Sequence, residues 1–152
     1  MGYSKSILIV LLTLSIHGCR CKASVSSQTF ITNSSTHQTE LIPYKDGLAM
    51  NQKSILLRNS ENKSFYTNNG GIFLFDIAVD SIEVVFDETI KAVHYSFEIS
   101  KSGKNPKAIK YNQPRNFHNS SSFELSIKEE SKCNTIYEYK YTFTEQDYLN
   151  AK

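Results

Sequence analysis

Between Gly70 and Ser100 the chain alternates apolar and polar residues over three consecutive runs, and this alternation constrains the fold more than any other feature of the sequence. The runs cover residues 73–79, 82–86 and 93–99. Successive side chains of a β-strand point to opposite faces of the sheet, so each run has the pattern of a strand with one buried face. We therefore predict a three-stranded antiparallel meander at the centre of an all-β domain.

The flanking sequence predicts further short strands separated by turns and by a polar loop at 112–121. The strongest turn signal is Asn68-Asn69-Gly70-Gly71, because Asn and Gly tolerate positive φ. Alternation returns after the meander, first at Phe123, Leu125 and Ile127 and then at Tyr137, Tyr139, Tyr141 and Phe143. About eight short strands without helical periodicity predict an antiparallel, Ig-like β-sandwich, or a small barrel. The domain should span residues 39–146, followed by a tail at 147–152.

The parity of these strands also predicts which side chains are buried. The apolar face should lie in one core and include Phe75, Ile77, Val84, Phe97 and Tyr139. The opposite face should be exposed and include Asp76, Glu83, Glu98 and Lys140. A register shift of one residue would invert both sets, so the prediction is sharp.

The N-terminus has the pattern of a signal peptide, which does not belong to the fold. Residues 1–6 carry one lysine, and the apolar run Ile7–Ile16 follows. A membrane-spanning helix needs about 20 apolar residues, so this run is too short to be one. The signal should therefore cover residues 1–18.

The end of this signal, Ile16-His17-Gly18-Cys19, resembles the lipobox of bacterial lipoproteins. His17 departs from that pattern, which usually has a small residue there. The resemblance implies that Cys19 is lipid-modified, becomes the new N-terminus and anchors the protein in the cell envelope, most simply in the outer membrane. The alternative is cleavage by ordinary signal peptidase, after Gly18 or Ala23, which would give a soluble secreted protein.

The chain has three cysteines, Cys19, Cys21 and Cys133. If Cys19 carries the lipid, the other two remain to pair in an oxidising compartment, so a Cys21–Cys133 disulfide is expected. Residues 19–38, rich in Ser and Thr, are expected to be a flexible tether between membrane and domain. The sequons at Asn33, Asn62 and Asn119 matter only for a secreted glycoprotein.

The charge of the chain argues against nucleic acid as a partner. The formal net charge is +2, and removing residues 1–18 takes away only Lys5, leaving +1. Binding to phosphates requires a concentrated basic face, whereas the lysines here are scattered.

Recognisable catalytic and metal-binding motifs are missing from the sequence, so neither catalytic residues nor a metal or cofactor are predicted. His94, Ser96 and Glu98 share the polar face of one predicted strand, but same-face neighbours lie about 7 Å apart, too far for a nucleophile–base hydrogen bond. A calcium site would require the acidic residues Asp76, Asp80, Asp87 and Glu88 to converge.

The tyrosine ladder at 137, 139 and 141 has two interpretations: core residues, or an outward binding platform. The sequence thus favours a non-enzymatic binding or adhesion module on the cell envelope, with a protein or glycan partner. The alternatives are a soluble secreted glycoprotein or inhibitor, and a small hydrolase with an unfamiliar site.

Overall fold

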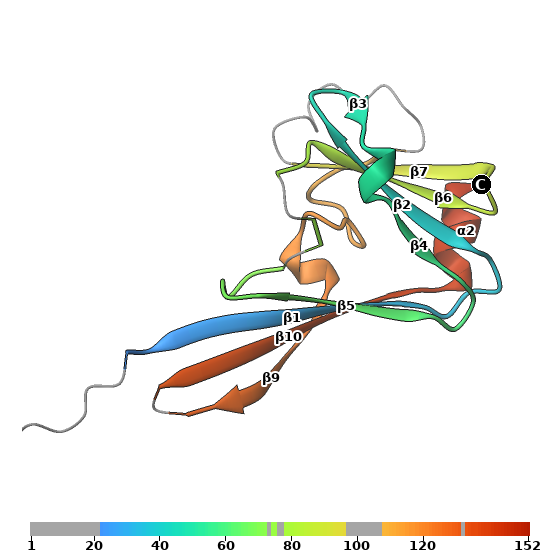
Figure 1. The fold of residues 1–152 in the computed structure, drawn as a ribbon. Coiled ribbons are helices and arrows are strands. Elements are labelled where there is room, and N and C mark those ends of the chain that lie inside the picture. Colours follow the sequence, from blue (N-terminus) through green and yellow to red (C-terminus); the bar gives the residue numbers. More distant parts are fainter. Residues whose placement is uncertain (1–21, 73, 76–77, 97–107, 132) are drawn as a thin grey trace, which may run out of the picture.

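The computed structural model describes residues 22–152 except 73, 76–77, 97–107 and 132. This part of the chain forms ten strands and one short helix, arranged as in Figure 1. The strands are β1 (Ser24–Asn33), β2 (Thr39–Lys45), β3 (Leu48–Ala49), β4 (Ile55–Leu57), β5 (Asn62–Thr67), β6 (Ser81–Phe86), β7 (Ile90–Tyr95), β8 (Ala108–Ile109), β9 (Glu124–Glu130) and β10 (Asn134–Phe143). The helix is α2 (Glu145–Ala151), and two 3₁₀ turns, η1 (Asn51–Lys53) and η2 (Ser120–Ser122), lie in connections.

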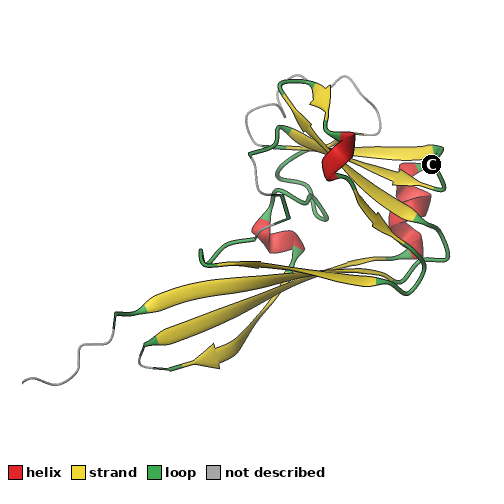
Figure 2. Cartoon of the chain, viewed as in Figure 1, coloured by secondary structure: helices red, strands yellow, loops and turns green. Residues whose placement is uncertain are grey.

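The strands form two sheets that pack face to face, as the cartoon in Figure 2 shows. The first sheet has the order β5-β1-β10-β9, and the second has the order β3-β2-β6-β7-β8, with β4 also paired to β2. This confirms the prediction of an all-β, sandwich-like fold, and the described strands do not close into a barrel. The sheets are mixed rather than purely antiparallel, because β1 pairs parallel to β10 and β7 pairs parallel to β8.

The hydrophobic core lies between the two sheets. Fully buried side chains come from the first sheet (Ile31, Tyr141, Phe143) and from the second (Leu41, Leu57, Ile82, Val84, Phe86). Phe117, from the predicted polar loop, fills the space between them and stacks on Tyr141 with 4.2 Å between ring centroids. The loop is therefore part of the core at this position.

The central meander was only partly predicted. β6 and β7 form the expected antiparallel pair, and Ile82, Val84 and Phe86 are buried as their parity indicated. The expected strand at 73–79 is wrong, because its described residues form bends and irregular backbone. Ile72, Leu74 and Val79 nevertheless pack against the core, so burial without a neighbouring strand explains the apolar composition.

The parity of β7 is the reverse of the prediction. Ala92 and His94 are buried, whereas Val93 and Tyr95 are only partly covered on the other face. The polar face predicted to be solvated is thus the one that faces the core in this strand. Phe97, Glu98 and Ile99 lie outside the described residues.

The remaining core predictions have mixed outcomes. Val84 is fully buried and Lys140 is exposed, as expected. Phe75 and Tyr139 are partly buried against the core. Glu83, expected to be exposed, is partly covered because its carboxylate accepts a hydrogen bond from Tyr44 Oη at 3.2 Å. Asp76 and Ile77 lie outside the described residues.

The segment expected to be a flexible tether contains the central strand of the first sheet. β1 lies between β5 and β10, and Ser27, Thr29 and Asn33 are completely buried. Small hydroxyl side chains are tolerated there because they find backbone acceptors, as when Ser27 Oγ donates to the Asn69 carbonyl at 3.0 Å. The folded domain therefore begins at Ser24 and not near Thr39.

No helix among the described residues has the length and apolar character needed to cross a membrane.

Candidate functional site

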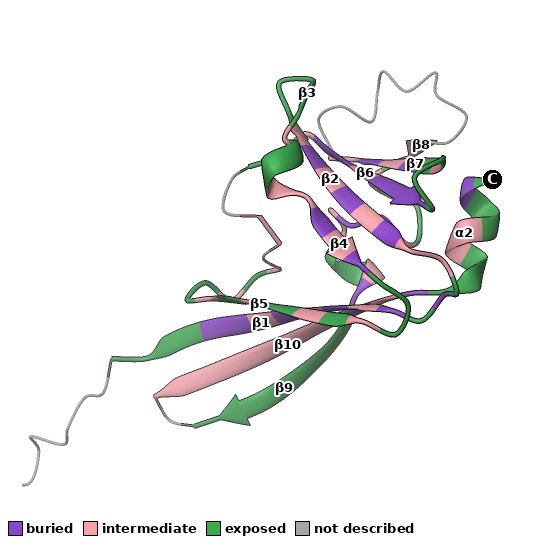
Figure 3. Cartoon of the chain, turned by 45° about the vertical axis from the view of Figure 1, so that its right-hand side comes forward, coloured by how far each residue is buried: buried purple, intermediate pink, exposed green. Residues whose placement is uncertain are grey.

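The first sheet extends beyond the second as an arm made of β1, β9 and β10 (Figure 1). Along this arm, the face that continues from the core carries apolar side chains that the second sheet does not cover. We call this set, which comprises Val25, Leu125, Ile127, Tyr137 and Tyr139, the distal face. Leu125 is 55 % exposed and Ile127 is 53 % exposed. Figure 3 shows β9 exposed along its whole length.

Strand pairing places these side chains together. Tyr137 lies opposite Ile127, and Tyr139 lies opposite Leu125, in the antiparallel β9–β10 ladder. Directly paired residues of antiparallel strands point to the same face with their Cβ atoms about 5 Å apart. The four side chains therefore form one contiguous apolar surface, which is rare on a solvated strand and typical of an interaction site.

The tyrosine ladder has one end in the core and the other end on the arm. Tyr141 is 1 % exposed in the core, and Tyr139 is half-buried and donates a hydrogen bond from its hydroxyl to the Gly70 carbonyl at 2.9 Å. Tyr137 lies one step further out along the arm. The turn at Gly70 presses closely on the arm, since a Cβ there would lie 2.6 Å from Val25 Cγ1. The ladder thus changes from core to surface along one strand.

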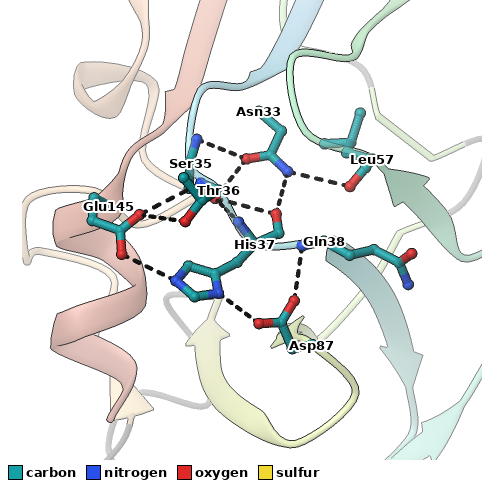
Figure 4. Close-up of polar contacts among 8 residues, drawn as sticks. All are labelled: Asn33, Ser35, Thr36, His37, Gln38, Leu57, Asp87 and Glu145. Carbon is teal, nitrogen blue, oxygen red and sulfur yellow. Dashed lines mark hydrogen bonds and ion pairs between the residues drawn. The ribbon is translucent and has the colours of Figure 1, made fainter.

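A second cluster, which we call the histidine clamp, joins the two sheets at the opposite end of the domain (Figure 4). His37 lies in the β1–β2 loop, and its Nδ1 is 2.5 Å from Asp87 Oδ2 while its Nε2 is 3.0 Å from Glu145 Oε1. Asp87 belongs to the β6–β7 turn and Glu145 begins α2. The ring also stacks on Tyr148 with 3.5 Å between ring centroids.

Asn33 holds the loop that carries His37 in place. Its side-chain amide donates to the carbonyls of His37 at 2.7 Å and Leu57 at 3.2 Å, and its Oδ1 accepts from the backbone N–H and hydroxyl of Ser35. These bonds shape the loop so that the imidazole points between the two carboxylates, as Figure 4 shows. The hydrogen bonds of Asn33 therefore hold the loop in the shape that brings His37 to both carboxylates.

Electrostatics strengthen the histidine clamp as a link between the elements that it joins. The hydrogen bond to Asp87 and the contact with Glu145 raise the pKa of His37, and the same contacts lower the pKa of each carboxylate. Both ring nitrogens contact a carboxylate oxygen, so the imidazole bridges Asp87 and Glu145. The arrangement fixes the loop, the turn and the helix relative to one another.

A third cluster surrounds a cavity of about 260 Å³ between β7, β10 and α2. His94 Nδ1 accepts the Phe117 backbone N–H at 3.3 Å, and burial, followed by the charges of His118 and Arg115, lowers the pKa of His94 to about 3. Arg115 makes two bonds to Asp147, at 3.0 and 2.5 Å, and lies 4.1 Å above the Tyr141 ring. The cavity is thus lined by a histidine that burial keeps neutral and by an arginine that is paired with a carboxylate.

The structure does not bring together the other residues that the sequence offered as a catalytic set or as a calcium site. His94 is buried, Ser96 is partly covered, and Glu98 lies outside the described residues, so no such set faces solvent. Asp80 and Asp87 lie at opposite ends of β6, roughly 20 Å apart for a six-residue strand, and Asp76 is outside the described residues. Across the part of the chain that the structure describes, no three His, Cys, Asp or Glu side chains form a metal site.

The sequons differ in accessibility. Asn33 is completely buried with its amide bonded, and Asn119 uses its side chain to cap η2 and to bond the Tyr111 carbonyl at 3.2 Å. Asn62 is exposed on β5. A glycan on the folded protein is thus compatible with Asn62 and incompatible with Asn33.

Cys133 lies in the β9–β10 turn at the tip of the arm, while Cys19 and Cys21 lie outside the described residues. The backbone N–H of Ser24, three residues after Cys21, donates to the Cys133 carbonyl at 2.9 Å. The first residue of β1 therefore lies beside the Cys133 turn.

No protein-family model, curated protein or solved structure matches this chain, so its function has to be inferred from its own residues. Sequence reasoning found the tyrosine ladder but missed the histidine clamp. Only the order of the loops in space brings His37, Asp87 and Glu145 together, because they are up to 108 residues apart in the chain.

Proposed function

We propose that this protein is exported, is anchored to the cell envelope by a lipid on Cys19, and acts as a non-enzymatic binding module through the distal face of its arm. The observation that carries the proposal is the exposure of Leu125 and Ile127 on a face that is otherwise the continuation of the core. Burying such side chains against a partner removes apolar surface from water and so favours association. The partner would be a protein or a glycan with an apolar surface.

The position of the first strand supports an anchored arrangement. β1 begins at Ser24, so the residues between Cys19 and the fold, 20–23, span at most about 14 Å when extended. A lipid on Cys19 would hold the tip of the arm, and with it the distal face, close to the membrane. A disulfide between Cys21 and Cys133 would shorten this connection further.

The location can be tested by fractionating bacterial cells that express the full chain. The unaltered protein should partition with membranes and carry diacylglycerol on Cys19 by intact mass. Cys19→Ser should release it into the soluble fraction. Membrane partitioning that does not change in Cys19→Ser would contradict the anchor, and a soluble unaltered protein would favour the secreted alternative.

The binding role can be tested by photo-crosslinking in the same cells. A photoreactive phenylalanine analogue placed at Ile127 should give one discrete crosslinked product. The matched control is Leu48, which is also an exposed apolar side chain on a strand, at 73 %, but lies in β3 on the other sheet. Equal crosslinking at both positions, or none at Ile127, would count against the distal face as a binding surface.

A further inference from the structure

The outer edge of β9 has no neighbouring strand among the described residues, since β9 ends the order β5-β1-β10-β9. An edge strand presents unpaired N–H and C=O groups that can pair with another chain. Alternating charges resist pairing with an arbitrary strand, and β9 carries Glu124 and Lys128 on one face. A partner strand for this edge therefore has to place opposite charges across from Glu124 and Lys128.

The sequence of β9 is complementary to that of a second, antiparallel copy of β9. In an antiparallel pair of two copies centred on Ser126, Glu124 lies opposite Lys128 of the second copy, and Leu125 lies opposite Ile127. Ser126 then lies opposite its own equivalent. Both charge pairs are opposite in sign, and opposite charges at directly paired positions stabilise a sheet.

Neighbouring registers are worse. If the pair were centred on Ile127, Glu124 would lie opposite Glu130, and Leu125 would lie opposite a charged Glu129. If it were centred on Leu125, Ile127 would lie opposite Phe123, which is 6 % exposed and is turned into the core. Of these three registers, the one centred on Ser126 is the one that pairs both the charges and the apolar side chains over residues 124–128.

From this geometry we infer that two copies of the chain associate by antiparallel pairing of their β9 edges, centred on Ser126. The two four-stranded sheets then continue as one, and the Leu125 and Ile127 side chains of both copies form a single apolar cluster. The contact is isologous, as is usual for dimers with two-fold symmetry. Leu125 and Ile127 belong both to this contact and to the distal face, so the molecule found in a crosslink from Ile127 decides between the two: a second copy for the self-pairing, a different molecule for the binding role.

The association should be weak. Five residues on each side bury less than the roughly 800 Å² per partner of a stable complex. β9 also has a register irregularity beside Lys128, where the pairing with β10 shifts. A trapping experiment therefore tests the dimer better than a mass measurement in dilute solution.

Ser126→Cys in the full chain, expressed in cells, provides that experiment. Because residue 126 faces its own equivalent, this variant should form a disulfide-linked dimer on a non-reducing gel that the unaltered protein lacks. Glu124→Cys is the matched control, since two copies of residue 124 would be separated by four residues along the pair, about 13 Å, beyond the reach of a disulfide. Equal dimer formation by both variants, or none by Ser126→Cys, would overturn the inference.

Charge reversal in the Ser126→Cys background tests the register. Lys128→Glu should reduce the trapped dimer by about fivefold, because it places like charges opposite each other twice. Adding Glu124→Lys should restore the dimer, although the pairing of Lys128 with Glu138 of its own chain, at 3.6 Å, stays broken. If the double reversal stays as low as Lys128→Glu, the proposed register is wrong.

The two proposals fail in different ways. A crosslinked product at Ile127 that contains another molecule, without a Ser126→Cys dimer, would overturn the self-pairing and leave the binding role standing. A Ser126→Cys dimer together with crosslinks from Ile127 only to a second copy would support the self-pairing and count against the binding role.

Discussion

Replacing Phe117 by Ala should destabilise the domain strongly, although this residue lies in a segment that reads as a polar loop. Phe117 is 2 % exposed, and its ring contacts Tyr141, Phe143 and His94 with centroid distances of 4.2, 5.2 and 5.0 Å. Removing a buried phenylalanine ring costs about 3–5 kcal/mol, because apolar burial is lost and a cavity remains. That is a large share of the roughly 5–15 kcal/mol that stabilises a typical domain.

Tyr66→Ala is the matched control. Tyr66 is an aromatic residue in a regular strand, β5, but it is 58 % exposed. Its replacement should cost less than about 1 kcal/mol, as surface changes usually do. A reading from the sequence alone, with strand aromatics buried and loop aromatics exposed, predicts the opposite order.

Urea denaturation of the purified variants measures both values. The chain contains no Trp, so unfolding is best followed by circular dichroism and by the fluorescence of its nine tyrosines. Both variants should retain the same dependence on urea concentration if the unfolded states are alike. If Tyr66→Ala proves the more damaging change, the position of Phe117 at the centre of the core is wrong.

Three further predictions concern the histidine clamp, the buried sequon and the cysteines. The pKa of His37 is raised above 6.5, so its contribution to stability should be fully present below pH 6.5 and lost as the pH rises through the raised pKa. The pKa values of Asp87 and Glu145 are lowered, so their contribution to stability should be lost as the pH falls below about 4. A melting-temperature profile should show both flanks, and His37→Gln should flatten them; identical profiles would refute the role of the clamp. Asn33→Ala should cost about 1–3 kcal/mol in urea denaturation, because it leaves buried carbonyls without donors, whereas Asn62→Ala should change little. Peptide mapping without reductant should show Cys21 linked to Cys133, and two free thiols there would contradict the pairing.

The sequence by itself determined the class of the fold and part of its core. Alternation correctly predicted the strands β6 and β10 and the burial of Val84. The prediction succeeded for these strands because each has one face on the core. Every second side chain is then buried, and every second residue is apolar. Asp46 and Gly47 both take positive φ in the turn after β2, a conformation that Asp and Gly tolerate.

Alternation failed where tertiary contacts determine burial. His94 is buried although it is polar, because the Phe117 backbone supplies a hydrogen bond and because burial lowers the pKa of His94, so that the ring stays neutral. β1 lies at the centre of a sheet although it is rich in Ser and Thr, because β5 and β10 pair with both of its edges.

Only the tertiary structure decided how distant segments meet. The parallel pairing of β1 with β10 joins residues about 110 positions apart, and it positions the arm, the Cys133 turn and the distal face. Leu125 and Ile127 have the same apolar pattern as a buried strand, yet they are exposed because the second sheet does not extend over them. A sequence shows which face of a strand is apolar; whether another layer covers that face depends on the lengths and positions of elements far away in the chain.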